Sequence, residues 1–507
     1  MRLAELLTAI TPEAITGTVD VEIAAIAYDS RHVPAGSLFC ALRGSSVDGH
    51  RFIPQALAAG AVAFLVEDAA AVPVGVPCVT VTDTRPAMAR LAASFYGEPT
   101  AAVPLVGITG TNGKTTTTYL VEGIMEAAGI PTAVLGTISY RFRDRTIPAP
   151  HTTPESVDLQ RTLRELVDAG ARGVVMEVSS HALDQHRVDG CRFRAGIFTN
   201  LTRDHLDYHG DMESYLQSKL RLFTELLPQA GGVGAVNLDD SYGPRVAAVA
   251  ACPVIGYGLA SGAQVTARDV VFSVDGIAAM IVTPAGEFPL RSPLMGRFNL
   301  ANILAAVAAG VALDLPLDAI AAGIAGHRRV PGRLERVEND RGVALLVDYA
   351  HTGDALENVL ATLSEIRAGR IITVFGCGGD RDAGKRPVMG EIAARYSDLA
   401  VVTSDNPRTE EPLAIVAQIR AGILPLGLRE YTAEELVADL PERGFVVEPD
   451  RRTAIRLAVR LARPGDIVLL AGKGHEDYQI IGTTKHHFDD REEAAAACRE
   501  LDPKGRG

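Results

Sequence analysis

Residues 107–118 read GITGTNGKTTTT and combine the residue types that bind nucleotide phosphates. Gly110 and Gly113 allow the backbone to turn tightly, so that successive N–H groups can point at phosphate oxygens. Lys114 adds a positive charge for the outer phosphates, and the hydroxyl of Thr115 can bind Mg²⁺. The strict phosphate-loop pattern would place glycine where this chain has Ile108, so the match is to the shorter form Gly-Thr-x-Gly-Lys-Thr. The nucleotide-binding residues that we expect are Gly110, Thr111, Asn112, Gly113, Lys114, Thr115 and Thr116.

The nucleotide is expected to be ATP, because the chain has no Asn-Lys-x-Asp motif of the kind that reads guanine. Transporters, helicases, kinases and ligases share such a loop, so the loop alone leaves the reaction open.

Two further side chains could serve a magnesium ion near Thr115. Glu177 lies near the end of the apolar run GVVMEV, and His205 follows the apolar run in AGIFTNL. In an open parallel sheet, residues just beyond the carboxyl ends of strands face the ligand crevice. Each residue also has a simpler interpretation, Glu177 as a helix cap and His205 as an ordinary polar loop residue.

The elements that must position these residues fall into three blocks. Residues 1–98 alternate short apolar runs with turns and predict a small α/β domain. Residues 99–330 open with the buried strand VPLVGITG and continue as strands alternating with helices, which predicts a mostly parallel sheet of the phosphate-loop ATPase type. Residues 331–507 carry the candidate strands VALLVDYA, RIITVFG, DLAVVTSD and DIVLLAG, and predict a second, Rossmann-like domain.

Composition narrows the class of protein. Of the 507 residues, 47% are hydrophobic, which is ample apolar material for folded cores. The formal net charge of −13 argues against a broad nucleic-acid surface. The six cysteines are scattered without a Cys-x-x-Cys pair, which fits a reducing compartment. No apolar run approaches the ~20 residues that are needed to span a bilayer. We therefore expect a cytoplasmic protein without membrane insertion.

Several longer motifs resemble one family. The phosphate loop is followed, in order, by EVSSHAL, TRDHLDYHG, GRFNLANILAA, PGRLE and DYAHTGDAL. These segments resemble the Mur ligases of bacterial cell-wall synthesis, and the resemblance extends from DSRHVPAGSLFCALRG near the N-terminus to AGKGHEDYQ.

The resemblance implies that ATP phosphorylates a substrate carboxylate and that the amine of an amino acid then attacks the acyl phosphate. Lys114 would hold the transferring phosphate, and Lys219 matches the family's carbamylated lysine, whose anionic group can bind a second Mg²⁺. An ordinary solvated lysine on a helix is the alternative for Lys219. The residues with implied catalytic roles are Lys114, Lys219 and His205. The implied magnesium ligands are Thr115, Glu177, His205 and Lys219 as a carbamate, and the residues implied to surround the nucleotide further are Asn299, Arg333 and Asp348, with His351 nearby.

The first block resembles the uridine-binding domain of the family members that add the third and fourth peptide residues. Tyr28 and Ser30 would contact the uridine end, with residues 45–47 nearby. The segment HTTPE at 151–155 resembles the member that adds the third residue. The residues implied to bind the UDP-N-acetylmuramoyl-L-alanyl-D-glutamate substrate there are Thr152, Thr153, Ser179, Gln185 and Arg187.

The segment DNPRTEEP at 405–412 follows an expected strand and matches the signature of the members that add meso-diaminopimelate. Diaminopimelate differs from lysine mainly by one distal carboxylate, which the guanidinium of Arg408 can bind through two parallel hydrogen bonds. Lysine would leave that arginine unpaired. A plain Asn-Pro turn is the alternative, and AGKGHE could also be taken for a second phosphate site. The other residues expected in the amino-acid pocket are Arg381, Asp405, Asn406, Pro407, Gly472 and Glu476.

The activity implied by the resemblance is the ATP-dependent addition of meso-diaminopimelate to the UDP-linked dipeptide by a monomer. Three alternatives stay open at this level: an L-lysine-adding ligase, a folylpolyglutamate-type ligase and a non-catalytic ATP-binding regulator. Arg408 argues against the first, the uridine-type N-terminal block against the second, and the intact set of catalytic and metal-binding residues against the third. The proton acceptor for the attacking amine is left open among His205, His351 and Glu476.

Overall fold

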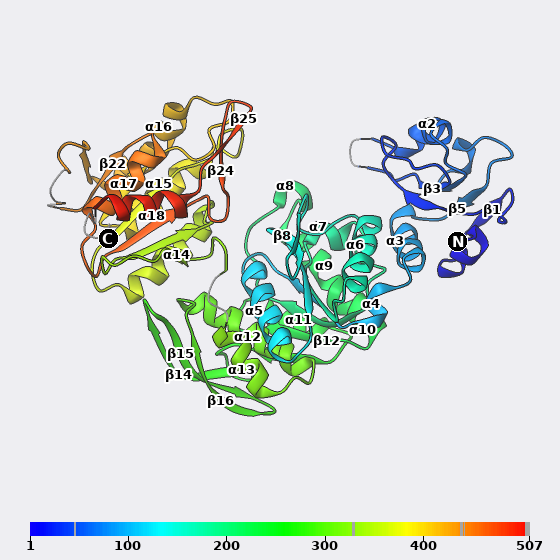
Figure 1. The fold of residues 1–507 in the computed structure, drawn as a ribbon, viewed down its shortest axis with the longest axis horizontal. Helices are drawn as coiled ribbons and strands as arrows, with labels where there is room; N and C mark the ends of the chain where they lie inside the picture. Colours follow the sequence, from blue (N-terminus) through cyan, green and yellow to red (C-terminus); the bar gives the residue numbers. More distant parts are fainter. Residues whose placement is uncertain (45–46, 327–329, 437–439, 441, 502–507) are drawn as a thin grey trace. The chain divides into compact units, whose positions relative to one another are not determined.

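The computed structural model describes residues 1–44, 47–326, 330–436, 440 and 442–501 (Figure 1). The chain divides into two compact units. The first comprises 1–267, 281–288 and 301–324, and the second comprises 268–280, 289–300 and 325–507.

The first unit begins with a five-stranded sheet in the order β1-β5-β4-β3-β2. Strands β2 to β5 pair in parallel, whereas β1 joins β5 antiparallel. The central strands β3 and β4 are buried along their whole length, because helices cover both faces of the sheet and demand apolar side chains on both. The elements are α1 Leu3–Leu6, β1 Ala14–Thr16, β2 Ala25–Ala27, β3 Ser37–Cys40, α2 Ile53–Ala58, β4 Ala63–Val66, β5 Cys78–Thr80 and α3 Thr84–Phe95.

The same unit contains an eight-stranded sheet in the order β13-β12-β11-β6-β10-β7-β8-β9. The strands from β13 to β7 are parallel, and β8 and β9 extend the edge antiparallel. The strands are β6 Leu105–Thr109, β7 Thr132–Leu135, β8 Ser139–Phe142, β9 Arg145–Pro148, β10 Gly173–Glu177, β11 Phe193–Phe198, β12 Val233–Asn237 and β13 Val254–Tyr257. The helices are α4 Pro99–Ala102, α5 Lys114–Ala127, α6 Ser156–Asp168, α7 Ser180–Asp184, α8 Leu206–His209, α9 Met212–Arg221, α10 Leu227–Ala230 and α11 Gly243–Val249.

The order of three of these strands creates the site. β6 lies between β10 and β11 although it precedes both in sequence, and the registers pair Ile108 with Glu177 and Thr109 with Phe198. Because the three strands are parallel, their carboxyl ends meet at one edge of the sheet. The segments that follow them are therefore neighbours.

Three strands that the sequence did not predict follow this sheet: β14 Thr266–Ser273, β15 Gly276–Thr283 and β16 Gly286–Ser292. The side chains of β14 are mostly exposed or half-buried, so the strand lacks the apolar run that marks a core strand. The helices α12 Arg297–Ala312 and α13 Leu317–Gly326 come next.

The second unit is built on a seven-stranded sheet in the order β17-β18-β23-β19-β20-β22-β21. All neighbours are parallel except β17 with β18. One face packs against α14, α15 and α16, and the other against α17 and α18. The strands are β17 Glu335–Arg336, β18 Ala344–Asp348, β19 Ile371–Phe375, β20 Leu399–Val402, β21 Arg429–Tyr431, β22 Gly444–Val447 and β23 Ile467–Ala471, with the hairpin β24 Tyr478–Ile481 and β25 Thr484–His487. The helices are α14 Gly353–Ile366, α15 Lys385–Tyr396, α16 Pro412–Ile423, α17 Arg451–Leu461 and α18 Asp490–Leu501.

The predicted fold class is confirmed: a small α/β sheet, a mostly parallel phosphate-loop sheet and a doubly wound C-terminal sheet follow one another along the chain. Among the helices of the described residues, none combines the length and the apolar character needed to cross a membrane.

Candidate functional site

The phosphate loop joins β6 to α5, as the sequence predicted. Gly110 has φ +144° and Gly113 has φ +85°, and neither position has room for a side chain. A Cβ on Gly110 would lie 1.9 Å from Oγ1 of Thr199, and a Cβ on Gly113 would lie 2.3 Å from Oδ1 of Asn302. The first-turn amides of α5, which have no partner within the helix, give an anion site directly after Gly113.

Two of the loop amides donate hydrogen bonds to another segment of the protein. The N–H groups of Thr111 and Asn112 donate to the main-chain and side-chain oxygens of Asn200, at 2.9 and 2.8 Å. These bonds hold the loop to the segment after β11. The Nζ of Lys114 lies over the loop and donates to the carbonyl oxygens of Gly110 and Thr111, at 3.0 and 2.7 Å.

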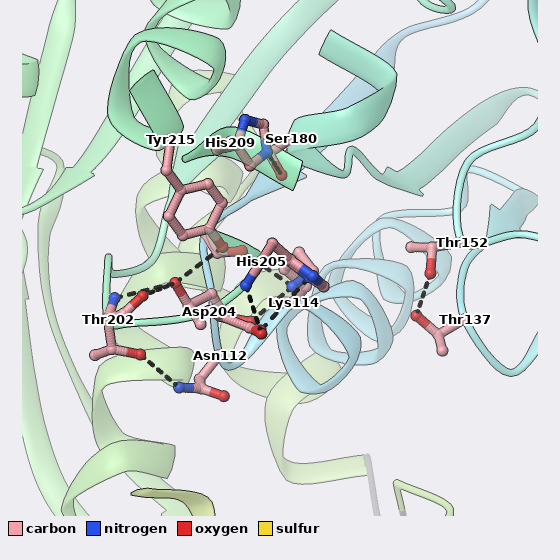
Figure 2. Close-up of polar contacts among 12 residues, drawn as sticks. Asn112, Lys114, Thr137, Thr152, Ser180, Thr202, Asp204, His205, His209 and Tyr215 are labelled. Atoms are coloured by element: carbon pink, nitrogen blue, oxygen red, sulfur yellow. Dashed lines mark hydrogen bonds and ion pairs between the residues drawn. The ribbon is translucent and has the colours of Figure 1, made fainter. Parts of the chain in front are cut away.

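The carboxylate of Glu177 is buried beneath the start of α5. It accepts the hydroxyl of Thr115 at 3.0 Å, and both the N–H and the hydroxyl of Thr137 at 3.0 Å. The hydroxyl of Thr137 also contacts that of Thr152 at 3.1 Å, a pair that Figure 2 draws well apart from Asp204 and Tyr215. Carboxylate and hydroxyl oxygens are the hard donors that Mg²⁺ prefers, so this set fits a magnesium ion.

Lys219 lies on α9 with only 2% of its surface exposed. Its Nζ donates to the carbonyl oxygen of Gly110 at 3.1 Å and lies 4.4 Å from the ring centroid of Tyr215. Burial, reinforced by the positive charge of Lys114, holds the pKa of Lys219 well below its usual value. Both effects favour the neutral, nucleophilic form of this amine beside the phosphate loop.

His205 lies at the start of α8 with φ +53°, and its side chain is about half exposed. Its Nε2 is 3.5 Å from a carboxylate oxygen of Asp204 (Figure 2). The rings of His181 and Tyr215 are 5.0 and 6.1 Å away between centroids. Within the described ranges, no three His, Cys, Asp or Glu side chains gather as a metal-binding group. The predicted magnesium ligands lie in two groups. Thr115 contacts Glu177, whereas Lys219 and His205 both lie near the ring of Tyr215.

Four of the five residues expected to bind the dipeptide substrate form one hydrogen-bonded group, whereas Thr152 contacts Thr137 instead. Thr153 donates its hydroxyl to the carbonyl of Glu177 at 2.8 Å and accepts the N–H of Ser179 at 3.1 Å. Ser179 in turn caps α7. The guanidinium of Arg187 donates to Oε1 of Gln185 at 2.6 and 3.1 Å, to the carbonyl of Thr153 at 3.0 Å, and pairs with Glu155 at 3.0 Å. These four side chains therefore lie close together, and their contact with the dipeptide stays a prediction.

The two residues expected at the uridine end have partners inside the first unit. Tyr28 donates its hydroxyl to Asp158 of α6, and burial, followed by Asp158, raises the pKa of Tyr28. The carbonyl of Ser30 accepts a hydrogen bond from the side chain of Gln55 at 3.1 Å. Of the expected neighbours, Ser45 and Ser46 lie outside the described residues.

Several residues that were expected to bind the amino acid lie close together in the second unit. Asn406 donates its amide to Glu476 at 3.0 Å, which links the segment after β20 to the segment after β23. Arg408 has φ +52° and donates to the carbonyl of Gly379 at 2.6 Å. Gly472 has φ +113°, and a Cβ there would lie 2.7 Å from a carboxylate oxygen of Asp405, so a side chain at this position would be strained. Pro407 is buried and Arg381 is exposed.

Asp348 and Arg333 lie near each other in the second unit. The two carboxylate oxygens of Asp348 accept the N–H groups of Leu334 and Ala350 at 2.7 and 2.8 Å. Burial raises the pKa of Asp348, and the positive charge of Arg333 acts against that rise. The guanidinium of Arg333 lies 5.1 Å from the ring centroid of Tyr349. Asn299 is buried in the first turn of α12, where its amide donates to the carbonyl of Met295 at 2.9 Å.

Sequence reasoning missed several residues that shape the site. Thr137 and Asn302 contact or crowd residues of the phosphate-loop region, and Lys473 lies against Asn406 and Glu476. Asn302 carried a signal, since it lies one helical turn after Asn299 in FNLANIL. Lys473 also carried one, in the Gly-Lys-Gly that directly follows a buried strand.

Comparison with known proteins identifies relatives over the whole chain. Family models match at residues 22–96 (Mur ligase family, catalytic domain), 108–310 (Mur ligase middle domain) and 332–474 (Mur ligase, glutamate ligase domain). Proteins named UDP-N-acetylmuramoyl-L-alanyl-D-glutamate–2,6-diaminopimelate ligase are similar to it: that of Geobacter metallireducens is 65% identical over 100% of both chains, and that of Gloeobacter violaceus is 49% identical over 100% of this chain and 99% of its own.

Solved structures of other proteins are also similar to this chain in fold. A structure of a UDP-N-acetylmuramoyl-L-alanyl-D-glutamate–2,6-diaminopimelate ligase superposes with a TM-score of 0.72 at 32% identity, covering 99% of each chain. A folylpolyglutamate synthase of Mycobacterium tuberculosis, complexed with ADP and AMPPCP, shares the fold at a TM-score of 0.60 and 18% identity, over 82% of this chain and 94% of its own.

Proposed function

Because this chain belongs to the Mur ligase family, we propose that it is an ATP-dependent ligase that adds meso-diaminopimelate to UDP-N-acetylmuramoyl-L-alanyl-D-glutamate. Residues 1–98 hold the uridine end, 99–330 hold ATP, and 331–507 hold the incoming amino acid. The reaction takes place in the cytoplasm, where ATP is available, and a monomer suffices because one chain carries all three binding regions.

The reaction has two steps. A carboxylate oxygen of the D-glutamyl residue attacks the γ-phosphorus of ATP, and ADP leaves with the electrons of the broken P–O bond. The amine of diaminopimelate then attacks the acyl carbon, phosphate leaves, and the ammonium-like nitrogen loses a proton. Catalysis rests on holding two anions together, which the charge of Lys114 and the amides of α5 favour.

Thr115 and Glu177 would hold Mg²⁺, with Lys219 as a carbamate and His205 completing the metal sites. Mg²⁺ supplies positive charge that reduces the repulsion between the γ-phosphate and the attacking carboxylate. The carbamate forms when the lone pair of the neutral Lys219 amine attacks the carbon of CO₂ and the nitrogen releases one proton. The support for this step is the burial of Lys219 and the low pKa that follows from it.

The observation that carries the choice of amino acid is the arrangement around Arg408. Arg408 lies two residues after Asn406 in the sequence, and the side-chain amide of Asn406 donates a hydrogen bond to Glu476. The pocket thus presents a cation for the distal carboxylate of diaminopimelate and an anion for its distal ammonium. Lysine offers the ammonium alone and leaves the guanidinium without its charged partner.

The test is the release of ADP by the purified protein with ATP, Mg²⁺ and the UDP-linked dipeptide, with meso-diaminopimelate and L-lysine in separate reactions. We expect release with diaminopimelate only. Arg408→Lys should lower kcat/KM for diaminopimelate by about 100-fold, because a point charge replaces a two-pronged donor. Arg420→Lys, at an exposed arginine paired with Glu430, is the matched control and should leave the rate unchanged.

Preference for L-lysine would overturn the role of Arg408 and keep the ligase reaction. If neither amino acid supports ADP release, the proposed reaction itself would be overturned.

A further inference from the structure

Lys473 is a buried cation that the proposed reaction does not use. It follows β23, and its side chain is 0% exposed. Its Nζ lies 3.4 Å from Oδ1 of Asn406, 3.5 Å from Oε2 of Glu476 and 3.9 Å from Oδ1 of Asp405. A buried ammonium is costly unless charged and hydrogen-bonding partners surround it, and here they come from both loops of the amino-acid pocket.

The contacts of Lys473 determine how Asn406 is oriented. Oδ1 of Asn406 faces two donors, the N–H of Ile480 at 2.9 Å and the ammonium of Lys473. Its Nδ2 must then point the other way, and it donates to Oε2 of Glu476 at 3.0 Å. Because an ammonium only donates, rotation of the amide by 180° would place NH₂ against NH₃⁺.

Lys473 also balances charge. Asp405 and Glu476 bring two carboxylates into a largely buried region. The nearby buried arginine, Arg451, is already paired with Asp490 at 2.6 Å, with both side chains fully buried. The Nζ of Lys473 lies within hydrogen-bonding or ion-pair distance of both carboxylates, at 3.9 Å from Asp405 and 3.5 Å from Glu476.

The same burial argues against a phosphate-binding role for the AGKGHE segment. A lysine that binds phosphate must present its ammonium to the ligand, whereas the ammonium of Lys473 faces Asn406, Glu476 and Asp405. The segment belongs to the amino-acid pocket.

We propose that Lys473 is a positioning residue for the amino-acid substrate: it fixes Asn406 and Glu476 in the orientation that receives the diamino acid. This inference rests on the proposed function. Lys473 does not touch the substrate; it acts through the two side chains that do.

The test is Lys473→Met, which keeps the length and apolar stem of the side chain and removes its charge. We expect KM for diaminopimelate to rise about tenfold or more, as for lost hydrogen bonds to charged groups, with kcat and KM for ATP little changed. Lys485→Met is the matched control, because Lys485 lies 3.6 Å from the ring centroid of Tyr478 in the same region but is exposed. An unchanged KM for diaminopimelate, or an equal rise in KM for all substrates, would overturn the inference.

A second comparison covers the case in which Lys473→Met alone does not fold. The double variant Lys473→Met with Glu476→Gln removes one charge of each sign and is compared with Glu476→Gln. If Lys473 acts through Asn406 and Glu476, the part of its effect that passes through Glu476 is already lost in Glu476→Gln. The double variant should then bind diaminopimelate less than about tenfold more weakly than Glu476→Gln in calorimetry, and a loss of about tenfold or more would contradict that mechanism. Failure of the wild-type protein to use diaminopimelate would instead count against the proposed function.

Discussion

The Nζ atoms of Lys114 and Lys219 both donate to one acceptor, the carbonyl oxygen of Gly110, at 3.0 and 3.1 Å. Two ammonium groups on one oxygen would repel each other strongly in a buried setting. The repulsion and the burial both favour the neutral form of Lys219, the more buried of the two. The phosphate loop therefore places the charge of Lys114 where it favours the uncharged form of Lys219.

We predict that Lys219 carries a carbamate. Protein equilibrated with ¹³C-labelled bicarbonate at pH 8 should show a carbamate carbon resonance that is absent from Lys219→Met. The folded-state pKa of Lys219 is lowered, so the amine is neutral above that pKa and protonated below it, and the signal should disappear as the pH falls. Lys219→Met should also lower kcat by about 100-fold, because an anionic metal ligand is lost. The same resonance in Lys219→Met would show that another amine is modified.

Neighbouring threonines of α5 should respond differently to loss of the hydroxyl. Thr115→Val removes the hydroxyl that contacts Glu177, and should lower kcat about 10- to 100-fold and raise the Mg²⁺ concentration needed. Thr117→Val is the matched control: the Thr117 hydroxyl is buried and has no hydrogen-bond partner in the described part of the chain. Its removal should leave activity unchanged and the melting temperature equal or higher. Equal losses in the two variants would contradict the magnesium role of Thr115.

Alanine substitutions at the two ends of α5 would distinguish the effect of backbone strain from that of steric crowding. Gly113 and Gly129 have similar φ angles, +85° and +76°, but a Cβ at Gly129 would meet no described atom within 4 Å. Gly129→Ala should cost about 1–2 kcal/mol from its left-handed backbone alone and leave the Kd for ATP unchanged. Gly113→Ala should carry the same backbone cost and should also displace Asn302. It should therefore weaken ATP binding, which calorimetry would measure. Similar Kd values for the two variants would mean that the phosphate loop tolerates a side chain.

Stability should depend on pH through His181. Burial, with the charges of His205 and His209, lowers the pKa of His181 to about 4. Between the ordinary histidine pKa and that value, the unfolded chain binds the proton and the folded chain does not, so stability decreases as the pH falls from about 6.5 to 4. The melting temperature of His181→Gln should decline less over this range than that of the wild type. Parallel declines would assign the acid sensitivity to other groups.

Local sequence patterns were sufficient to predict the phosphate loop and many of the parallel strands. The phosphate loop was predictable because its glycines, lysine and threonine lie within one turn that joins a buried strand to a helix. The parallel strands were predictable because burial on both faces leaves continuous apolar runs such as LVGIT and IVLLA. The half-exposed strand β14 lacks such a run and was missed.

The long-range pairings were decided by the tertiary structure. Lys219 and Gly110 are 109 residues apart, and no periodicity encodes that Lys219 is buried against the loop. The hydrogen bond from Tyr28 to Asp158, and the enclosure of Lys473 by Asn406 and Glu476, are of the same kind.

The physical reason lies in the strand order. Sequence reports which side chains prefer burial and where the backbone turns, both of which depend on near neighbours. It does not report that β6 lies between β10 and β11, or that β23 lies between β18 and β19. Those neighbours decide which loops meet, and with them the charge, hydration and pKa of each residue in the site.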